Sequence, residues 1–410
     1  VVGDEAGTAI TVGDESVAVG FEALMTVTSG AENVGIGYRA LKLTTGNSNV
    51  AVGKNALATN SSASNNTAVG VSSLLANTTG ADNVAVGKNA LVANTTAAHN
   101  VGIGADALET NTTGTANTAV GTTALGSNTT ASNNTAVGRS ALGANTTGAS
   151  NVAVGALALD ANTTGERNTS VGTSSLTTNT TGTGNSAFGF KSLENSTTAS
   201  NNTAFGQDTL RATTTGASNV AIGIDAMDAN TTGADNVAVG RDALGANTTA
   251  ASNVAVGRTA LGANTTGALN VAIGSLALDA NQTGAANTAV GYNALGASTG
   301  DGATAVGKDA LELNTSGVNT AVGANALATV TSGTGNVAVG NDALTVSTAA
   351  NNTAVGFSAL VANTTGHSNT AVGKSALTAN TTAVNNTAVG IDALLATTTG
   401  GTNTAIGVAS

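Results

Sequence analysis

The sequence predicts an all-β protein, a parallel β-solenoid (β-roll) of about 24 stacked coils of 17 residues each. A five-residue string, Asn66-Thr67-Ala68-Val69-Gly70 in one copy, recurs with small changes along the chain. Its glycine, here called the marker glycine, occurs 24 times, and most neighbouring copies lie 17 residues apart. Four residues after it stands Leu, or Met227 in one copy. A unit this short cannot bury its own apolar side chains, so we expect the units to stack.

Each coil is expected to begin with a short strand. In residues 67 to 69, apolar or β-branched residues alternate with a small one, which is a strand pattern of period two. We expect Thr67 and Val69 to face inward and Ala68 to face outward. A second short strand should hold Ser73 and Leu74, with Leu74 inside. The Asn that opens nearly every unit should form a ladder of side-chain amides along the axis. At about 4.8 Å per coil, the stack would be on the order of 115 Å long.

Polar corners connect these strands. The corner after each Leu reads Asn-Thr-Thr-Gly in many copies, and Gly and Asn favour turns. Four units are one residue shorter, and each deletion falls in this corner, which leaves the strand register intact. We therefore predict one continuous solenoid over residues 16–410. Residues 1–15, which include Val12-Gly13, form an irregular segment and a candidate strand donor or cap, through which chains could polymerise end to end.

Composition excludes several classes of protein. The chain has 54 Gly, no Pro, no Cys and only 9% charged residues. Its mean hydropathy of +0.16 and its periodic pattern argue against disorder. A net charge of −11 argues against general nucleic-acid binding, which needs clustered Lys and Arg. The sequence contains no run of 18 apolar residues, so no membrane-spanning helix is predicted. Residues Val1 to Glu5 show no secretion signal.

The small residues predict lateral association. Ala51, Ala68 and Ala85 belong to one uncharged column, and Ala56, Ser73 and Ala90 to a second. If both columns face outward, they offer a packing surface along the stack. The expected partner is the chain itself, in a homotrimer.

No catalytic or cofactor-binding site is predicted. His99 and His367 are the two histidines, and they lie far apart in polar corners without convergent partners. Acidic residues occur singly in the corners, without calcium-loop spacing, so no metal site is predicted, although calcium between coils or chains stays open. These residues are Asp82, Asp106, Asp225, Asp235 and Asp242. Gly35-Ile36-Gly37 and Gly102-Ile103-Gly104 lack the rest of a dinucleotide loop and are interpreted as coil glycines.

Two further patterns have a competing interpretation. Asn-X-Thr strings such as Asn77-Thr78-Thr79 match a glycosylation acceptor, but turns and ladders account for them without sugar. Thr columns raise an ice-binding hypothesis. The first residue of each expected strand is Val in some coils, such as Val84, and Thr in others, such as Thr118, without a regular order. A column of side chains that faces inward tolerates this exchange, whereas an outward ice-binding face would not.

The strings at residues 151 to 155 and 352 to 356, followed by Ala-Leu and Asn-Thr-Thr-Gly, resemble the head repeats of trimeric autotransporter adhesins. They look closer still to longer-period repeats of phage tail fibres and large bacterial surface proteins. The resemblance covers residues 16 to 410. It implies a left-handed β-roll with three chains side by side, working outside the cell as a stalk or adhesive head. The unit is longer than the adhesin repeat, and no coiled-coil stalk, membrane-anchor barrel or self-cleaving fibre chaperone follows it, so the fibre class stays open.

The sequence therefore predicts a non-enzymatic structural fibre or adhesive shaft, extracellular or on a cell surface. The alternatives are a receptor-binding tail fibre of a virion or an adhesin head, recognising a host or matrix ligand, and an ice-binding solenoid.

Overall fold

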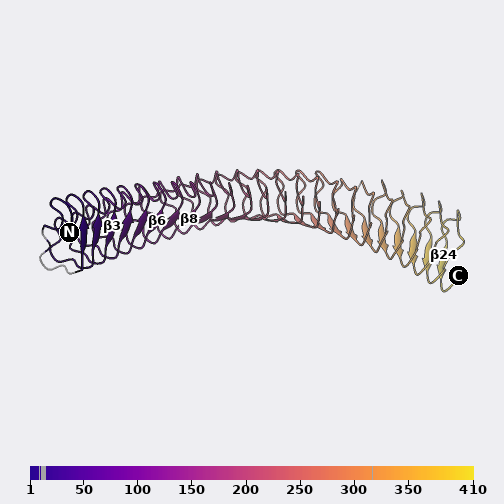
Figure 1. Cartoon of the computed structure of the whole chain (residues 1–410). Coiled ribbons are helices and arrows are strands. Elements are labelled where there is room, and N and C mark those ends of the chain that lie inside the picture. The colour runs from indigo at the N-terminus through magenta and orange to yellow at the C-terminus, as the bar shows by residue number, and fades with distance from the viewer. Residues whose placement is uncertain (9, 11–14, 316) are drawn as a thin grey trace. The chain divides into compact units, whose positions relative to one another are not determined.

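The computed structural model describes residues 1–8, 10, 15–315 and 317–410. It confirms the predicted fold class: the chain is an all-β parallel β-solenoid of about 23 turns with 17 residues per turn, and the described residues contain no helix. The chain divides into two compact units, Val1–Asn202 and Thr203–Ser410. Within each unit, consecutive strands lie side by side and the connecting loops close each coil (Figure 1).

Each strand is three residues long. The first unit contains β1 (Val17–Val19), β2 (Val34–Ile36), β3 (Val50–Val52), β4 (Thr67–Val69), β5 (Val84–Val86), β6 (Val101–Ile103), β7 (Thr118–Val120), β8 (Thr135–Val137), β9 (Val152–Val154), β10 (Thr169–Val171) and β11 (Ser186–Phe188). The second unit contains β12 (Thr203–Phe205), β13 (Val220–Ile222), β14 (Val237–Val239), β15 (Val254–Val256), β16 (Val271–Ile273), β17 (Thr288–Val290), β18 (Thr304–Val306), β19 (Thr320–Val322), β20 (Val337–Val339), β21 (Thr353–Val355), β22 (Thr370–Val372), β23 (Thr387–Val389) and β24 (Thr404–Ile406).

The strands pair in parallel and in register, so equivalent residues of successive coils form straight columns. Ala68 pairs with Ala85, and Val69 pairs with Val86. Each strand ends at its marker glycine because the backbone there leaves the extended region. Gly70 has a φ of 137°, and a Cβ on it would lie 2.5 Å from the carbonyl oxygen of Gly87. Only glycine satisfies both conditions.

The prediction of a second strand at Ser73 and Leu74 is wrong. Residues 71 to 76 form a turn, and Leu74 has a φ of 48°, in the left-handed region rather than the extended one. The coils still bond to one another here: the Leu74 amide donates to the carbonyl of Ala90 in the next coil at 2.9 Å, and the Ser72 amide donates to Lys54 in the previous coil at 2.9 Å. Hydrogen bonds to both neighbouring coils hold these left-handed residues in place.

The core differs from the sequence prediction in one respect. Leu74 is fully buried, as predicted, but the orientation of the strand is reversed. Ala68 has no exposed surface, whereas Val69 is 37% exposed and Thr67 is half-buried. The Leu column leaves little room beside the strand: at Gly102 an added Cβ would already lie 3.3 Å from Cγ of Leu91. A methyl group fits there and an isopropyl group does not.

The predicted asparagine ladder is confirmed. The amide nitrogen Nδ2 of Asn83 donates to Oδ1 of Asn66 at 3.2 Å and to the carbonyl of Ala97 at 2.9 Å. The ladder residues are buried and recur coil after coil within each unit. At position 303 the ladder Asn is replaced by Ala, but the backbone amide of Ala303 still donates to Oδ1 of Asn287 at 2.9 Å.

A second ladder was not predicted. The Asn of the Asn-Thr-Thr-Gly corner is also buried, and Nδ2 of Asn94 donates to Oδ1 of Asn77 at 2.9 Å. Nδ2 of Asn77 in turn donates to Oδ1 of Asn60 at 3.0 Å and to the carbonyl of Gly80 at 2.9 Å. These bonds satisfy polar groups that would otherwise be buried without partners.

The N-terminal segment joins the stack in part. Val2 forms a parallel bridge with Val19 of β1, and its amide donates to the carbonyl of Ala18 at 2.8 Å. Val12-Gly13, part of the predicted strand donor or cap, lies outside the described residues. Among the residues that are described, no helix has the length and hydropathy to cross a membrane.

Candidate functional site

The most distinctive surface is the outward side of the strands, here called the strand face. It consists of the first and third residue of each strand. The third residue is Val, Ile or Phe in all 24 strands, and many of these side chains are more than a third exposed: Ile36 38%, Val86 36%, Ile103 39%, Val137 37%, Phe205 58%, Ile273 41% and Val322 38%. The first residue is Val, Thr or Ser. Each unit therefore presents an uncharged band in which the third residue of every strand is apolar and the first is Val, Thr or Ser.

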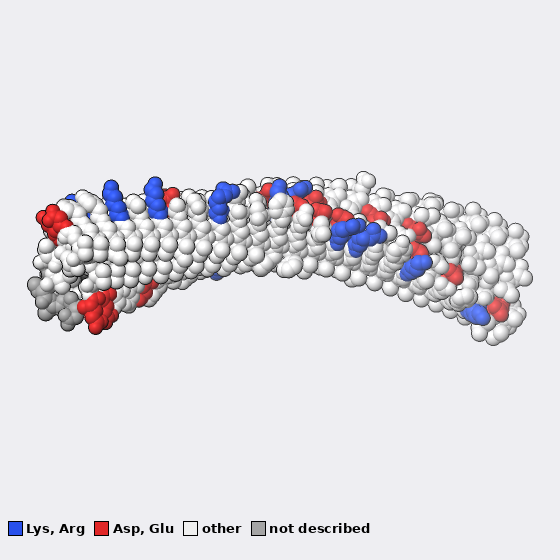
Figure 2. Space-filling view, in the orientation of Figure 1, with Lys and Arg blue, Asp and Glu red and all other residues white. Residues whose placement is uncertain are grey.

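No strand residue is charged. In Figure 2, the Lys, Arg, Asp and Glu side chains visible on the first unit lie along the edges of a broad uncharged area. The corners of the coils carry charged residues, among them Lys54, Lys88 and Asp106. An apolar band with charges only at its rim is typical of an interaction surface.

The small-residue columns do not form the predicted packing surface. Ala51, Ala68 and Ala85 have no exposed surface, and neither have Ala56, Ser73 and Ala90. Both columns lie inside the coil, so any lateral contact must use other side chains. Period-two alternation predicts that Ala and Val lie on opposite faces of the strand, but it does not predict which face is buried.

The Thr residues also face outward. Thr67 is half-buried on the strand face, so the argument against an ice-binding face that relied on an inward column is wrong. The Asn-Thr-Thr corner adds an exposed column that the sequence analysis missed, although it repeats at a constant spacing of 17. In the first unit this threonine column is Thr79, Thr96, Thr113, Thr130, Thr147, Thr164, Thr181 and Thr198. The preceding Thr is fixed, since Oγ1 of Thr78 donates to the carbonyl of Thr95 at 2.9 Å.

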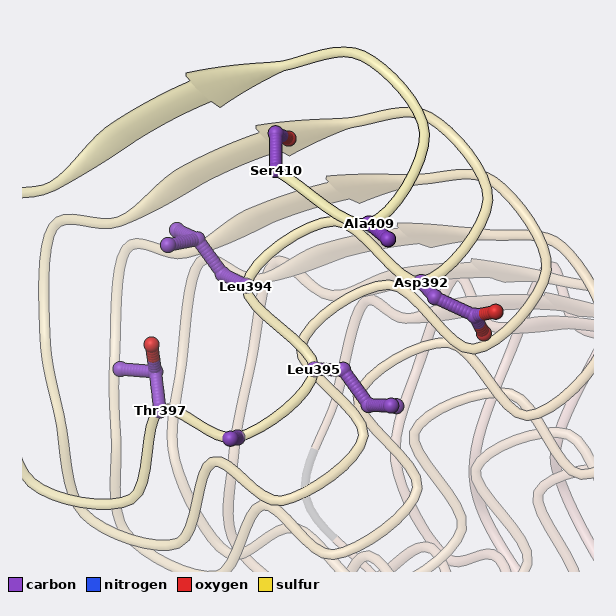
Figure 3. Close-up of a pocket in the computed structure, with 7 residues that line it drawn as sticks. Asp392, Leu394, Leu395, Thr397, Ala409 and Ser410 are labelled. Carbon is purple, nitrogen blue, oxygen red and sulfur yellow. The ribbon is translucent and has the colours of Figure 1, made fainter.

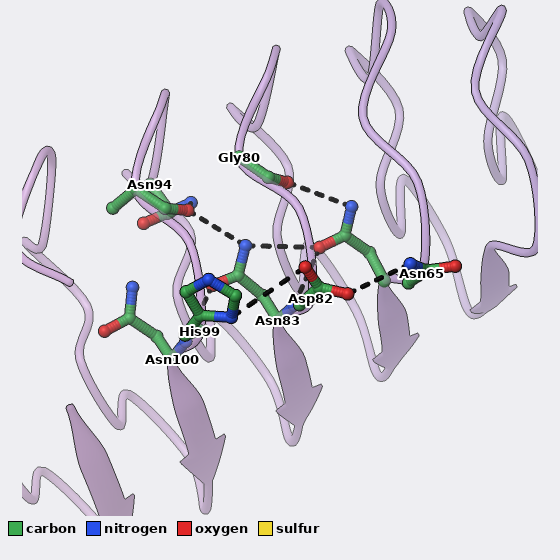
Figure 4. Close-up of polar contacts among 9 residues, drawn as sticks. Asn65, Gly80, Asp82, Asn83, Asn94, His99 and Asn100 are labelled. Atoms are coloured by element: carbon green, nitrogen blue, oxygen red, sulfur yellow. Dashed lines mark hydrogen bonds and ion pairs between the residues drawn. The ribbon is translucent and has the colours of Figure 1, made fainter. Parts of the chain in front are cut away.

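The Asn-Thr-Thr strings carry no accessible acceptor in the folded chain. Asn77 has no exposed surface, and its Nδ2 atom makes two hydrogen bonds within the ladders. Asn77 and its equivalents thus belong to the second ladder, whereas Asn65, which opens the string Asn65-Asn66-Thr67, is exposed. The exposed column beside the other ladder holds Asn65, whose Nδ2 donates to Oδ1 of Asp82 at 3.0 Å (Figure 4).

The histidines and corner carboxylates do not converge. Nδ1 of His99 lies 3.8 Å from Oδ2 of Asp82, and both side chains are exposed. His367 contacts its neighbour Ser368. Among the described residues, no group of three or more His, Cys, Asp and Glu is placed to hold a metal ion. Gly35 and Gly102 lie in β2 and β6 as coil glycines.

One hollow of about 400 Å³ runs along the turns of the first unit. Gly126 and Gly143 line it, with Glu109 one coil before them and Asp160 one coil after. Burial raises the pKa of the Asp160 carboxyl, and Arg139 opposes this shift. The same order of acid, glycine, glycine, acid recurs in the second unit, where burial also raises the pKa of the two carboxyls; its residues are Asp228, Gly245, Gly262 and Asp279.

A second hollow of about 410 Å³ lies at the last coils, lined by Leu394, Leu395 and Thr397 with Asp392 at its side (Figure 3). Its lining is largely aliphatic. One carboxylate among aliphatic groups offers no acid–base pair and no nucleophile with a neighbouring base.

A cluster of three charged side chains lies near the N-terminus. Oε2 of Glu22 accepts from Nε of Arg39 at 2.8 Å and lies 2.6 Å from Nζ of Lys42. These hydrogen bonds, with that from Lys42 the stronger influence, lower the pKa of the Glu22 carboxyl.

No protein-family model matches the chain, and the search of curated proteins found no match either. The chain is a β-solenoid repeat protein with stacked Asn ladders.

Proposed function

We propose that this protein is a structural shaft that works outside the cell, and that its copies associate side by side, as trimers, through the strand face. The observation that carries the proposal is the uncharged apolar band on the outward side of β1 to β11 and of β12 to β24. The resemblance to adhesin and tail-fibre repeats points to the same class of protein.

The size of the band supports an interface. Eleven strands at about 4.8 Å make a strip of about 50 Å in the first unit, and at a width of roughly 10 Å it covers on the order of 500 Å². The largest apolar patch of a typical monomer covers about 300 to 600 Å² and is often functional, so a band of this size is a candidate interface. A second copy of the chain fits because it repeats its own Val and Ile residues at the same axial spacing, so the two bands interdigitate along their length.

Charge also favours this face. Two chains with a net charge of −11 repel each other on approach. Contact through the strand face keeps the charged corners in water at the rim, where repulsion is screened by salt.

Two pairs of substitutions test the proposal. Val120→Lys with Val137→Lys places two charges on the strand face in adjacent coils. Thr113→Lys with Thr130→Lys places the same charges on the exposed threonine column of the same unit. We expect the first pair to reduce the assembly to single chains in sedimentation experiments, because a buried unpaired charge is costly. The second pair should leave the assembly intact. If both variants assemble to the same extent, the strand face is not the interface.

Ice binding is a second candidate, favoured by the outward Thr and Val of the strands and by the threonine column. Regularly spaced hydroxyl and methyl groups on a rigid sheet can order water. Thermal hysteresis, compared between the native chain and the two Lys pairs, measures this activity directly. Absence of hysteresis in the native chain would end this candidate and leave the shaft proposal in place.

A further inference from the structure

The residue directly after each marker glycine forms an exposed column, here called the corner column. It holds seven of the twelve Lys and Arg residues and five of the seven Phe and Tyr residues, but none of the 23 Asp and Glu residues. A corner that only had to be soluble would carry acids in a chain with twice as many acids as bases. The column therefore selects cations and aromatic rings.

Local charge pairing does not account for this selection. Arg241 and Lys308 do pair with the Asp that follows each of them, at 3.2 and 3.1 Å. The other five cations of the column are followed by Asn, Ser or Thr, which cannot pair with them; they are Lys54, Lys88, Arg139, Arg258 and Lys374. The residue that follows does not neutralise their charge, and of the three in the first unit Arg139 also interacts with Asp160.

The start of the first unit gathers these groups. The rings of Phe21 and Tyr38 stack with centroids 5.5 Å apart, and Nζ of Lys54 lies 6.0 Å from the Tyr38 centroid. The guanidinium of Arg39 lies 5.0 Å from the same centroid. Tyr38 is 41% exposed and Phe21 is 38% exposed. Such cation–π contacts hold both rings and charges in fixed positions at the surface.

The charges that face this column differ between the units. In the second unit, the next column carries Asp208, Asp225 and Asp242 in successive coils, which would repel an anion. In the first unit that column holds two acids, Glu22 and Asp106, and Glu22 is already paired with Arg39 and Lys42. Figure 2 shows basic side chains spaced along one edge of the first unit.

We infer that the corner column of the first unit binds a linear acidic polysaccharide lying along the stack, with uronic-acid carboxylates at Lys54, Lys88 and Arg139. These cations are two and three coils apart, about 10 and 14 Å at the strand spacing of. This wide spacing favours a polymer with one carboxylate per disaccharide over a nucleic-acid strand, which carries a phosphate at every nucleotide. The inference does not depend on lateral association.

Binding of hyaluronan oligosaccharides to the full chain, measured by calorimetry at low salt, tests the inference. The variant Lys54→Gln, Lys88→Gln, Arg139→Gln should lose about tenfold or more in affinity, since each exposed ion pair adds a modest amount. Its matched control removes three cations outside the column: Arg167→Gln, Lys191→Gln, Arg211→Gln. The control should stay within about twofold.

Three results would overturn the inference. One is the absence of hyaluronan binding by the native chain at low salt. Another is an equal loss of affinity in both triple variants, which would indicate only net charge. The third is tighter binding of a single-stranded polythymidine than of hyaluronan, which would indicate a nucleic-acid surface. Neutral dextran serves as the uncharged polymer and should not bind.

Discussion

Oδ1 of Asn66 accepts two hydrogen bonds from Asn83 of the next coil, one from the backbone amide at 3.0 Å and one from Nδ2 at 3.2 Å. Oδ1 of Asn83 then accepts from the amide of Asn100 at 2.9 Å. The Asn83 side chain thus bonds to the ladder side chain of the previous coil and to the backbone amide of the next one, in a fully buried position.

Asn83→Ala should therefore destabilise its coil strongly. It removes the donor to Ala97 and the acceptor for Asn100, and leaves buried polar groups unpaired, at a cost of about 2 to 4 kcal/mol. Hydrogen exchange measures the effect locally, and protection of the amides around β5 and β6 should fall. Thr96→Ala, at an exposed position of the same coil, is the control and should change protection little. Equal protection in the two variants would contradict the role of the ladder.

Ser196→Asn should stabilise the first unit. In the second ladder, Oδ1 of Asn179 is buried and has no hydrogen-bond partner among the described residues, and the next coil offers Ser196 in place of Asn. An Asn there would donate to Asn179, as Asn179 donates to Asn162 at 2.9 Å. We expect a gain of about 1 kcal/mol in urea unfolding. Thr198→Asn, exposed in the same coil, should give no gain, and a Ser196→Asn variant no more stable than this control would refute the prediction.

Substitution by alanine should be costly at one glycine of a coil and nearly neutral at another glycine of the same coil. Gly104 has a φ of 135°, and a Cβ would lie 2.5 Å from the carbonyl oxygen of Gly121, so Gly104→Ala should cost about 3 kcal/mol or more. Gly102 occupies the inward strand position that is Ala in most coils, and its Cβ would meet Cγ of Leu91 at 3.3 Å. Gly102→Ala should change stability by less than about 1 kcal/mol. Thermal unfolding of both variants checks this, and similar losses would contradict the assigned geometry.

Much of the fold was predictable from the sequence because the repeat is strict. Coil length, strand position, the inward Leu74 and the first ladder follow from spacing alone. The reversed strand was not predictable from alternation, since it depends on how little space Leu91 leaves beside Gly102. The turn at Leu74 was missed because a left-handed φ is unusual for Leu, and only the hydrogen bonds of neighbouring coils explain it.

The candidate surfaces followed less directly. The prediction that Ala68 faces outward placed the interface on two columns of small residues that are in fact buried. The corner column was readable in the sequence, since Lys54 and Lys88 share one position after the marker glycine. Its meaning depends on knowing that this position is exposed and that Phe21, Tyr38 and Lys54 stack.

Asp160 should make stability depend on pH. Burial raises the pKa of its carboxyl in the folded chain above the ordinary value of 3.8. Folding therefore favours the protonated form, and this contribution is present below the ordinary value and is lost as the pH rises through the raised one. Asp160→Asn should be more stable than the native chain at pH 7, by a few tenths of a kcal/mol because the carboxyl is only half-buried. The difference should vanish at low pH in urea unfolding, and a difference that grows there would contradict the sign.

The strand face is the central claim about function, and static light scattering of the native chain at low micromolar concentration tests it most directly. A shaft that associates through Val69, Val86 and their equivalents should scatter as an assembly of three chains of 38.7 kDa each. A mass of one chain at these concentrations would contradict the account.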